Sequence, residues 1–263
     1  MSREVFKDIL MRQCSYLRKN NQIINNHDQN KKVAVIVEPR RHEMLESVIR
    51  NFMYFLGESW NLILYTYEDN IEWVRSLFPG SDFNIVPLPF PNMNQLLYSF
   101  MLMDIAFWKG IREEHILIFQ TDCILFKKGI DNYLEYDYVG ANFTSPLTIA
   151  PRIGGIQGGL SLRRKSAMIK CIENFDWETI QNYRTSINYS TFKHKVEDIY
   201  FTYACDFLNL NVLPVSERDM FSIECEYYDK PIGHHGSQHD HYTKEQAMAI
   251  ISQCEDLKGL YDM

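Results

Sequence analysis

Asp122 is the residue of this sequence best placed to bind a metal ion. It follows an apolar run at residues 115–119 and the polar pair Gln120 and Thr121. A carboxylate at the end of a buried strand can hold a divalent cation through its oxygen atoms. Aspartate is equally common there as a cap of a turn or helix. The residues alone give the two interpretations equal weight.

Gly158 and Gly159 are a second candidate feature, because they adjoin an apolar segment that is typical of a strand. Glycine has no side chain, so a ligand could approach the backbone closely here. A plain turn or bulge explains the pair at least as well.

Glu197 and Asp198 precede an apolar-rich helical segment at residues 199–204. Carboxylates in a first helical turn favour the helix dipole and cap its amides, and this structural interpretation is the default. The functional alternative is a general base that takes a proton from an acceptor hydroxyl.

Histidines are concentrated in residues 233–241, which hold half of the eight in the chain. Such a density suggests metal binding. An exposed polar loop competes with this interpretation, and the glycines of the segment disfavour a rigid helical pair of ligands. A zinc site made by this segment alone is therefore the weaker hypothesis.

Arg40 and Arg41 follow an apolar run at residues 33–37 and could contact a nucleobase or a diphosphate. Solvated surface arginines would look the same. The sequence has no Gly-x-Gly-x-x-Gly or Walker loop, which disfavours dinucleotide dehydrogenases and P-loop enzymes. It has no Gly-x-Ser-x-Gly elbow either, which disfavours a serine hydrolase.

Short apolar runs that alternate with amphipathic segments must position these residues. Strands are predicted at residues 33–37, 62–65, 83–87 and 115–120, each followed by a helical or polar segment. Asp69 is predicted to cap the helix after the second strand, and one helix is predicted through residues 96–107. This order predicts an α/β fold with a mostly parallel central sheet flanked by helices. Ligands bind at the carboxyl ends of such strands, where both Arg40 and Asp122 fall. Residues 1–32 are predicted to be an N-terminal helix and a polar linker, and residues 33–263 a single domain.

Composition narrows the possible partners. The net charge of −7 disfavours a surface that neutralises nucleic-acid phosphates.

The charged N-terminus is unlike a signal peptide, and no apolar run could span a bilayer, so a cytoplasmic location is expected. The six cysteines are scattered and are expected to pack in the core. Frequent Asn, Ile and Lys favour an AT-rich viral or bacterial genome, with host cytoplasm as the location if viral.

Several segments together resemble a family of GT-A-like glycosyltransferases catalogued as a domain of unknown function. The resemblance covers most of the chain from residue 33 onward, and its order and spacing are more specific than any one motif. The matching segments are residues 35–42, 107–108, 116–122, 136–141, 158–163, 197–198 and 233–235.

The resemblance implies a GT-A-like, Rossmann-like fold and a hexosyl- or N-acetylhexosaminyl-type transferase. Asp122 and His235 would then bind Mn²⁺ or Mg²⁺, and Asp198, with Glu197 as the alternate, would be the base of an inverting reaction. One departure is that GT-A enzymes usually show Asp-x-Asp, whereas the motif here is Gln120-Thr121-Asp122 followed by Cys123. The nucleotide-sugar donor, with UDP favoured, would contact Val37, Glu38, Arg40, Arg41, Gln120, Thr121, Gly158 and Gly159.

Two other functions fit parts of the sequence. A metal-dependent nucleotidyltransferase would also place an acidic residue at a strand end, but it usually needs more carboxylates near Asp122. A non-catalytic glycan-binding module would keep the fold without the chemistry. The joint presence of Asp122, Asp198 and His235 favours an enzyme, and a retaining mechanism would not need the base. The acceptor is expected to be a glycan or a protein, and the oligomeric state is open.

Overall fold

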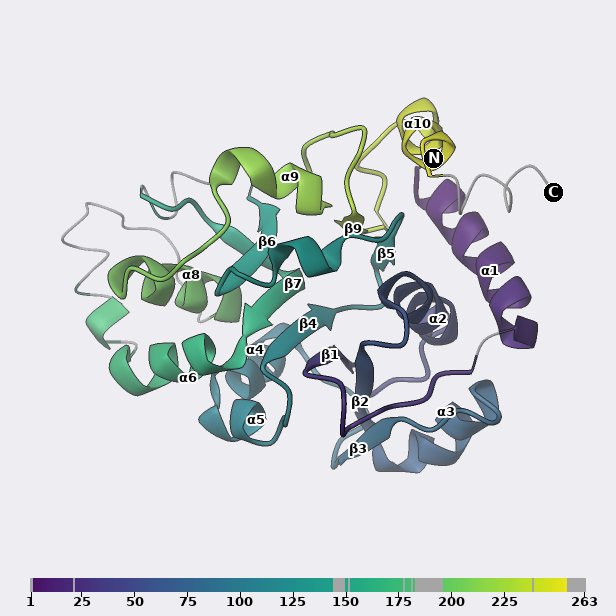
Figure 1. The fold of residues 1–263 in the computed structure, drawn as a ribbon, viewed down its shortest axis with the longest axis horizontal. Coiled ribbons are helices and arrows are strands. Elements are labelled where there is room, and N and C mark those ends of the chain that lie inside the picture. Colours follow the sequence, from purple (N-terminus) through teal and green to yellow (C-terminus); the bar gives the residue numbers. More distant parts are fainter. Residues whose placement is uncertain are drawn as a thin grey trace.

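The computed structural model describes residues 2–20, 22–143, 150, 152–176, 178–180, 182, 196–237 and 239–254. Its centre is a six-stranded sheet in the order β3-β2-β1-β4-β7-β6 (Figure 1). Strands β1 to β4 are parallel to one another, and β7 is antiparallel to both of its neighbours. The strands are β1 (Lys32–Val37), β2 (Asn61–Tyr67), β3 (Asn84–Leu88), β4 (His115–Phe119), β6 (Tyr138–Asn142) and β7 (Ile156–Arg164).

Helices cover both faces of this sheet, which confirms the predicted α/β fold with a mostly parallel sheet. The longer helices are α1 (Ser2–Asn20), α2 (Leu45–Leu56), α3 (Ile71–Leu77), α4 (Gln95–Met103), α6 (Lys165–Asn174), α8 (Glu197–Phe207) and α10 (Lys244–Ser252). The shorter ones are α5 (Ile105–Lys109), α9 (Arg218–Phe221) and the 3₁₀ helices Glu68–Asn70, Ile130–Tyr133 and Val215–Glu217. Among the described residues, no helix is both long and apolar enough to cross a membrane.

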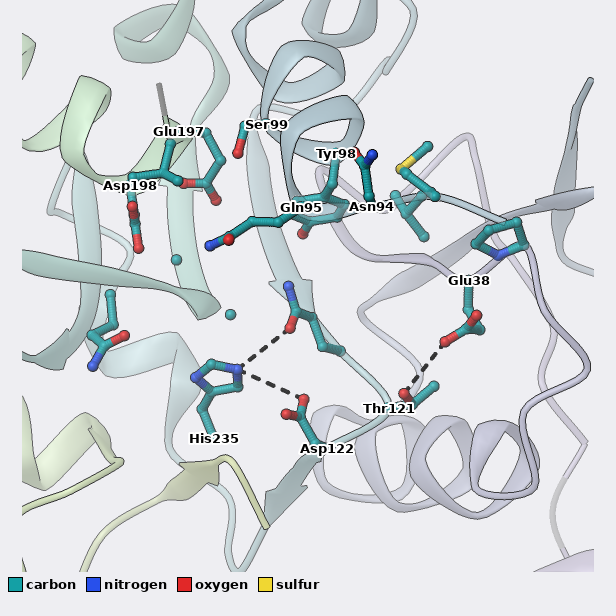
Figure 2. Close-up of a pocket in the computed structure, with 18 of the residues that line it drawn as sticks. Glu38, Asn94, Gln95, Tyr98, Ser99, Thr121, Asp122, Glu197, Asp198 and His235 are labelled. Atoms are coloured by element: carbon teal, nitrogen blue, oxygen red, sulfur yellow. Dashed lines mark hydrogen bonds and ion pairs between the residues drawn. The ribbon is translucent and has the colours of Figure 1, made fainter. Parts of the chain in front are cut away.

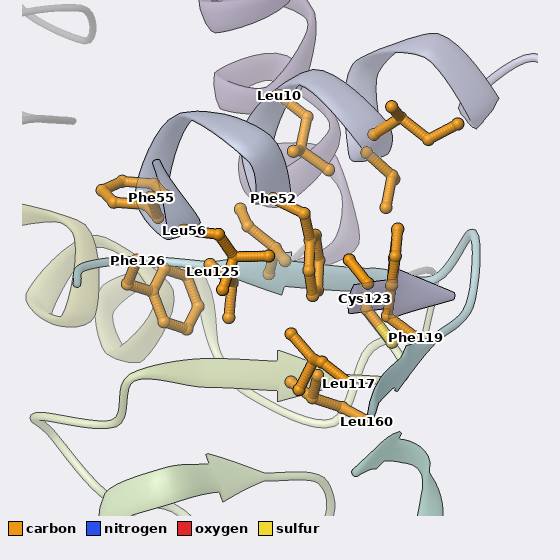
Figure 3. Close-up of a cluster of buried hydrophobic side chains, with 14 of the residues drawn as sticks. Leu10, Phe52, Phe55, Leu56, Leu117, Phe119, Cys123, Leu125, Phe126 and Leu160 are labelled. Carbon is orange, nitrogen blue, oxygen red and sulfur yellow. The ribbon is translucent and has the colours of Figure 1, made fainter. Parts of the chain in front are cut away.

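The uninterrupted apolar runs of the strands explain this two-sided cover. In β1, Ala34 and Ile36 join the core beneath α1 and α2, whereas Val33 and Val35 join the core beneath α5, α6 and α8. Successive side chains of a strand point to opposite faces, so a continuous apolar run needs helices on both. Figure 3 shows part of the first core, in which Phe52 stacks on Phe119 with ring centroids 4.1 Å apart.

A second, three-stranded sheet lies beyond the end of β4. It has the order β5-β9-β8, with β5 (Cys123–Leu125) antiparallel to β9 (Gly233–His235) and β8 (Ser222–Ile223) parallel to β9. Its register places Cys123 opposite His235, so two segments far apart in sequence meet at this point. His235, one predicted metal ligand, lies in β9, and Asp122, the other, immediately precedes β5.

Two local predictions were wrong. Asp69, the predicted cap of the third helix, lies inside the 3₁₀ helix Glu68–Asn70, and α3 starts at Ile71 without a side-chain cap. The single helix predicted through residues 96–107 is two helices, because Asp104 is extended and its carboxylate caps α5 by accepting from the Ala106 amide at 2.9 Å.

Candidate active site

A pocket of about 510 Å³ lies at the carboxyl ends of β1 and β4, as the parallel topology predicts (Figure 2). Its lining comes from the two strand ends, the start of α4, the glycines of β7, the start of α8 and the small sheet. The lining residues are Val37, Glu38, Pro39, Arg40, His42, Met93, Asn94, Gln95, Tyr98, Ser99, Gln120, Thr121, Asp122, Gln157, Gly158, Gly159, Val196, Glu197, Asp198, Glu224 and His235.

Asp122 and His235 meet at the floor of this pocket because β5 and β9 pair. Asp122 Oδ1 lies 3.6 Å from His235 Nε2, and Gln120 Oε1 lies 3.4 Å from the same nitrogen. The other ring nitrogen, Nδ1, lies 3.0 Å from Glu224 Oε2. Burial alone would lower the pKa of His235, because it disfavours the charged imidazole. The carboxylates of Glu224 and Asp122 have the larger opposite effect and raise this pKa to about 8.

These donors fit a divalent cation. Asp122 Oδ1 is buried without a hydrogen-bond partner among the described residues. Glu224 holds His235 so that Nε2 faces Asp122, and carboxylates orient metal-bound histidines in the same way. The Cys123 sulfur, one carboxylate oxygen of Asp122 and one ring nitrogen of His235 all lie within 4.8 Å of one another. A carboxylate and an imidazole are suitable donors for Mn²⁺ or Mg²⁺.

Cys123 is the least available of the three donors. Its thiol accepts a hydrogen bond from the Gln120 amide at 3.2 Å and donates to the Gly159 carbonyl oxygen at 3.3 Å. Burial and the neighbouring Asp122 raise its pKa well above the usual value for a thiol. The thiolate form that binds metals is therefore disfavoured at this position.

The two glycines of β7 make room for charged side chains of the pocket. A Cβ on Gly158 would lie 2.4 Å from Glu197 Oε1 and 2.7 Å from Arg163 Nη2. A Cβ on Gly159 would lie 2.2 Å from His235 Nε2. Both separations are too short for real atoms, so the glycines allow close approach of side chains of this chain itself.

Glu197 and Asp198 form the first turn of α8 and face the pocket from the side opposite Glu38 (Figure 2). Glu197 Oε1 accepts a hydrogen bond at 2.9 Å from Arg163 Nη2, and both side chains are buried. Arg163 itself donates to Ser161 at 2.9 Å. Burial and the adjacent Glu197 charge raise the pKa of Asp198 to about 8.

Glu38 organises the end of β1. Its carboxylate accepts two hydrogen bonds of 2.7 Å from the Arg40 guanidinium, and Thr121 donates to it at 3.4 Å. The Arg40 side chain lines the pocket and is still 55% exposed. Arg41, its predicted companion, lies outside the lining and donates to Asn70 at 2.8 Å.

Sequence patterns do not single out the contribution of α4. Asn94 caps this helix by accepting from the Leu97 amide at 2.9 Å, and the next turns bring Gln95, Tyr98 and Ser99 into the lining. The capping asparagine after a proline-rich turn is the one local signal of a helix start here. No sequence pattern marks Glu224 as a pocket residue, because its position beside His235 depends on the pairing of β8 with β9.

Comparisons with known proteins define the family. The family model described as "Protein of unknown function (DUF5672)" matches residues 84–235, more than half of the 263 residues. The chain belongs to the DUF5672 family. The segment that matches the DUF5672 model runs from β3 to β9 and contains Asp122, Asp198 and His235, whereas Glu38 and Arg40 precede it.

Two solved structures that resemble this chain are glycosyltransferases by their descriptions. The apo form of mouse xyloside xylosyltransferase 1 matches with a TM-score of 0.53 and 12% identity over 79% of this chain and 97% of the mouse chain. The apo form of the glycosyltransferase GlyE from Streptococcus pneumoniae TIGR4 matches with a TM-score of 0.48 and 10% identity over 89% of this chain and 62% of that chain. No curated protein matches the sequence. The likeness to the mouse enzyme gives this DUF5672 member a glycosyltransferase-like fold.

Proposed function

We propose that this DUF5672 protein is a glycosyltransferase that moves a sugar from a nucleotide-diphosphate sugar to a hydroxyl of a glycan or protein acceptor. The observation that carries the proposal is that one pocket is lined both by Asp122 and His235, whose donor atoms suit a cation, and by the carboxylates of Glu197 and Asp198. A metal-assisted, inverting transfer uses both functions, because a diphosphate leaves while a hydroxyl loses its proton to a base.

The donor is proposed to bind along the ends of β1 and β4. Arg40 supplies a positive charge that Glu38 holds in place, and a guanidinium is well suited to contact phosphate oxygens. Val37, Gln120 and Thr121 line the same wall of the pocket.

Asp122 and His235 would hold Mn²⁺ or Mg²⁺, and the chemistry such an ion supplies is neutralisation of the charge on the leaving diphosphate. Glu224 keeps the His235 ring in the orientation that this binding needs.

Asp198 is the proposed general base of an inverting reaction. The acceptor oxygen forms a bond to the anomeric carbon, the bond from that carbon to the diphosphate oxygen breaks, and the acceptor proton passes to Asp198. A raised pKa makes Asp198 a stronger base than an ordinary carboxylate once it is ionised.

The direct test is release of nucleoside diphosphate from a panel of nucleotide sugars, measured with and without Mn²⁺ and without an acceptor. We expect release for one donor class and a loss of about 100-fold or more in Asp122→Asn, because electrostatic stabilisation of the leaving group is a large term in catalysis. Asp28→Asn, at an exposed position far from the lining, is the matched control.

Two outcomes would contradict the proposal. Pyrophosphate release from a nucleoside triphosphate, with no cleavage of nucleotide sugars, would indicate a nucleotidyltransferase. Glycan binding without any turnover would indicate a binding module. The preference for UDP, the cytoplasmic location, the viral or bacterial source and the division at residue 32 stay predictions of the sequence.

A further inference from the structure

A polar recess between α4 and α8 contains two buried atoms that the proposed chemistry leaves unused. The hydroxyl oxygen of Tyr98 and Oε2 of Glu197 are both shielded from solvent and have no hydrogen-bond partner among the described residues. Both side chains line the pocket, and the two helices contact each other. Leaving a buried polar group unpaired is destabilising, so a ligand that pairs with both atoms would gain affinity.

Glu197 is held so that only one of its oxygens is available. Arg163 occupies Oε1, and the Arg163 guanidinium is itself fixed by Ser161 and by the rings of Tyr138 and Phe201, at 4.7 and 5.3 Å from their centroids. The carboxylate therefore keeps one orientation, with Oε2 left as a hydrogen-bond acceptor beside the pocket.

Tyr98 approaches the same recess from α4. Burial and the negative charge of Glu197 raise the pKa of its hydroxyl, an effect that Gln120 offsets only in part, so the phenol stays protonated. A protonated phenol can both donate and accept a hydrogen bond. Figure 2 shows Gln95, Tyr98 and Ser99 on one side of the pocket, with Glu197 close by.

The chemistry of this recess suits the hydroxyl groups of a sugar ring. A carboxylate oxygen accepts from one hydroxyl, and a phenol pairs with another as donor or acceptor. We propose that the recess between α4 and α8 binds the transferred sugar, with Tyr98 and Glu197 bonded to its hydroxyls, and that it selects neutral sugars over uronates. The carboxylate of an anionic sugar would lie beside Glu197 Oε2, the oxygen that Arg163 does not bond.

This inference rests on the proposed function, and it assigns Glu197 to sugar binding so that Asp198 alone is the base. Its test compares ligands that share a nucleotide and differ in the sugar. The probes are UDP, GDP and ADP, their glucose, galactose and N-acetylglucosamine conjugates, and UDP-glucuronate, with binding measured by calorimetry in the presence of Mn²⁺.

Tyr98→Phe removes one hydroxyl and leaves the ring in place. We expect its affinity for the free nucleoside diphosphate to equal that of the wild type, and its affinity for the neutral conjugate to fall about fivefold, the usual effect of one hydrogen bond. Tyr136→Phe, outside the pocket lining, is the matched control. An equal change for the diphosphate and its conjugate, or no change for either, would overturn the subsite.

Glu197→Gln tests the selection of charge. The wild type should bind the neutral UDP conjugates at least about tenfold more tightly than UDP-glucuronate, and this ratio should shrink severalfold in the variant. Equal binding of neutral and anionic conjugates by the wild type would overturn the claim whether or not the variant folds. A wild type that binds no nucleotide at all would overturn the proposed function, and the subsite with it, whereas loss of the subsite alone leaves nucleotide binding intact.

Discussion

Asp198 is the pocket residue whose protonation most directly limits the proposed reaction. Its pKa is about 8 because burial and Glu197 disfavour the charged form, with Glu224 adding to this and Arg163 opposing it. A base must be ionised before it accepts a proton, so kcat/KM should rise with pH up to about 8 and then level off. The measurement is a pH profile of nucleotide-sugar cleavage at saturating Mn²⁺, which keeps His235 deprotonated.

The same profile in Glu197→Gln checks the cause of this pKa. Removing the neighbouring negative charge makes ionisation of Asp198 easier, so the midpoint should move to lower pH. If the midpoint of the kcat/KM profile is the same in Glu197→Gln and the wild type, the titration belongs to another group. A wild-type kcat/KM that does not change with pH would exclude Asp198 as the base.

Gly159 gives a residue-scale test that leaves the charged groups unchanged. In Gly159→Ala the new Cβ would lie 2.2 Å from His235 Nε2, so the imidazole must move away from Asp122. We expect Mn²⁺-dependent activity to fall by about tenfold or more, because small misplacement of a catalytic group is costly. Gly110→Ala is the control, since its Cβ would lie 3.2 Å from the Ala106 carbonyl oxygen and outside the pocket. Equal activity of both variants would show that His235 does not need its present position.

At the scale of elements, Asp104 separates α4, which lines the pocket, from α5, which packs in the core. Asp104→Ala removes the cap of α5 and should lower the free energy of unfolding by about 1 kcal/mol. The turnover of folded protein should be unchanged, because the side chain lies outside the lining. Urea denaturation and kcat measured on the same sample test both statements, and a loss of kcat without a loss of stability would contradict them.

The elements also show which features a sequence can reveal. The apolar runs of β1 and β4 predict buried parallel strands, and these runs place Glu38 and Asp122 at strand ends without further information. The meeting of Asp122 with His235 depends on the β5 and β9 pairing, which is a long-range contact that no local pattern encodes. The resemblance to a known family predicted that pair, whereas only the structure identifies Tyr98 and Glu224 as residues of the pocket.

At the scale of the whole molecule, α1 is packed into the same core as the central sheet, beside α2 and α10 (Figure 1). Phe6 contacts Phe126 and His234, with ring centroids 5.7 and 5.1 Å apart, so α1 lies against β9, the strand that carries His235. The buried apolar residues of α1 are Val5, Phe6, Ile9, Leu10, Cys14 and Leu17.

A chain that starts at residue 33 should therefore fail to fold as a stable unit. Each large apolar side chain that loses its burial costs about 1.5–3 kcal/mol, and the sum for α1 is on the order of the whole stability of a typical domain. Phe6→Ala is the milder variant and should cost about 3–5 kcal/mol. Thermal unfolding of the full chain, the truncated chain and Phe6→Ala measures this directly. A truncated chain with an unchanged midpoint would show that residues 33–263 fold without the helix, whereas a truncated chain that unfolds would make α1 part of the structure that holds β9 and His235 in place.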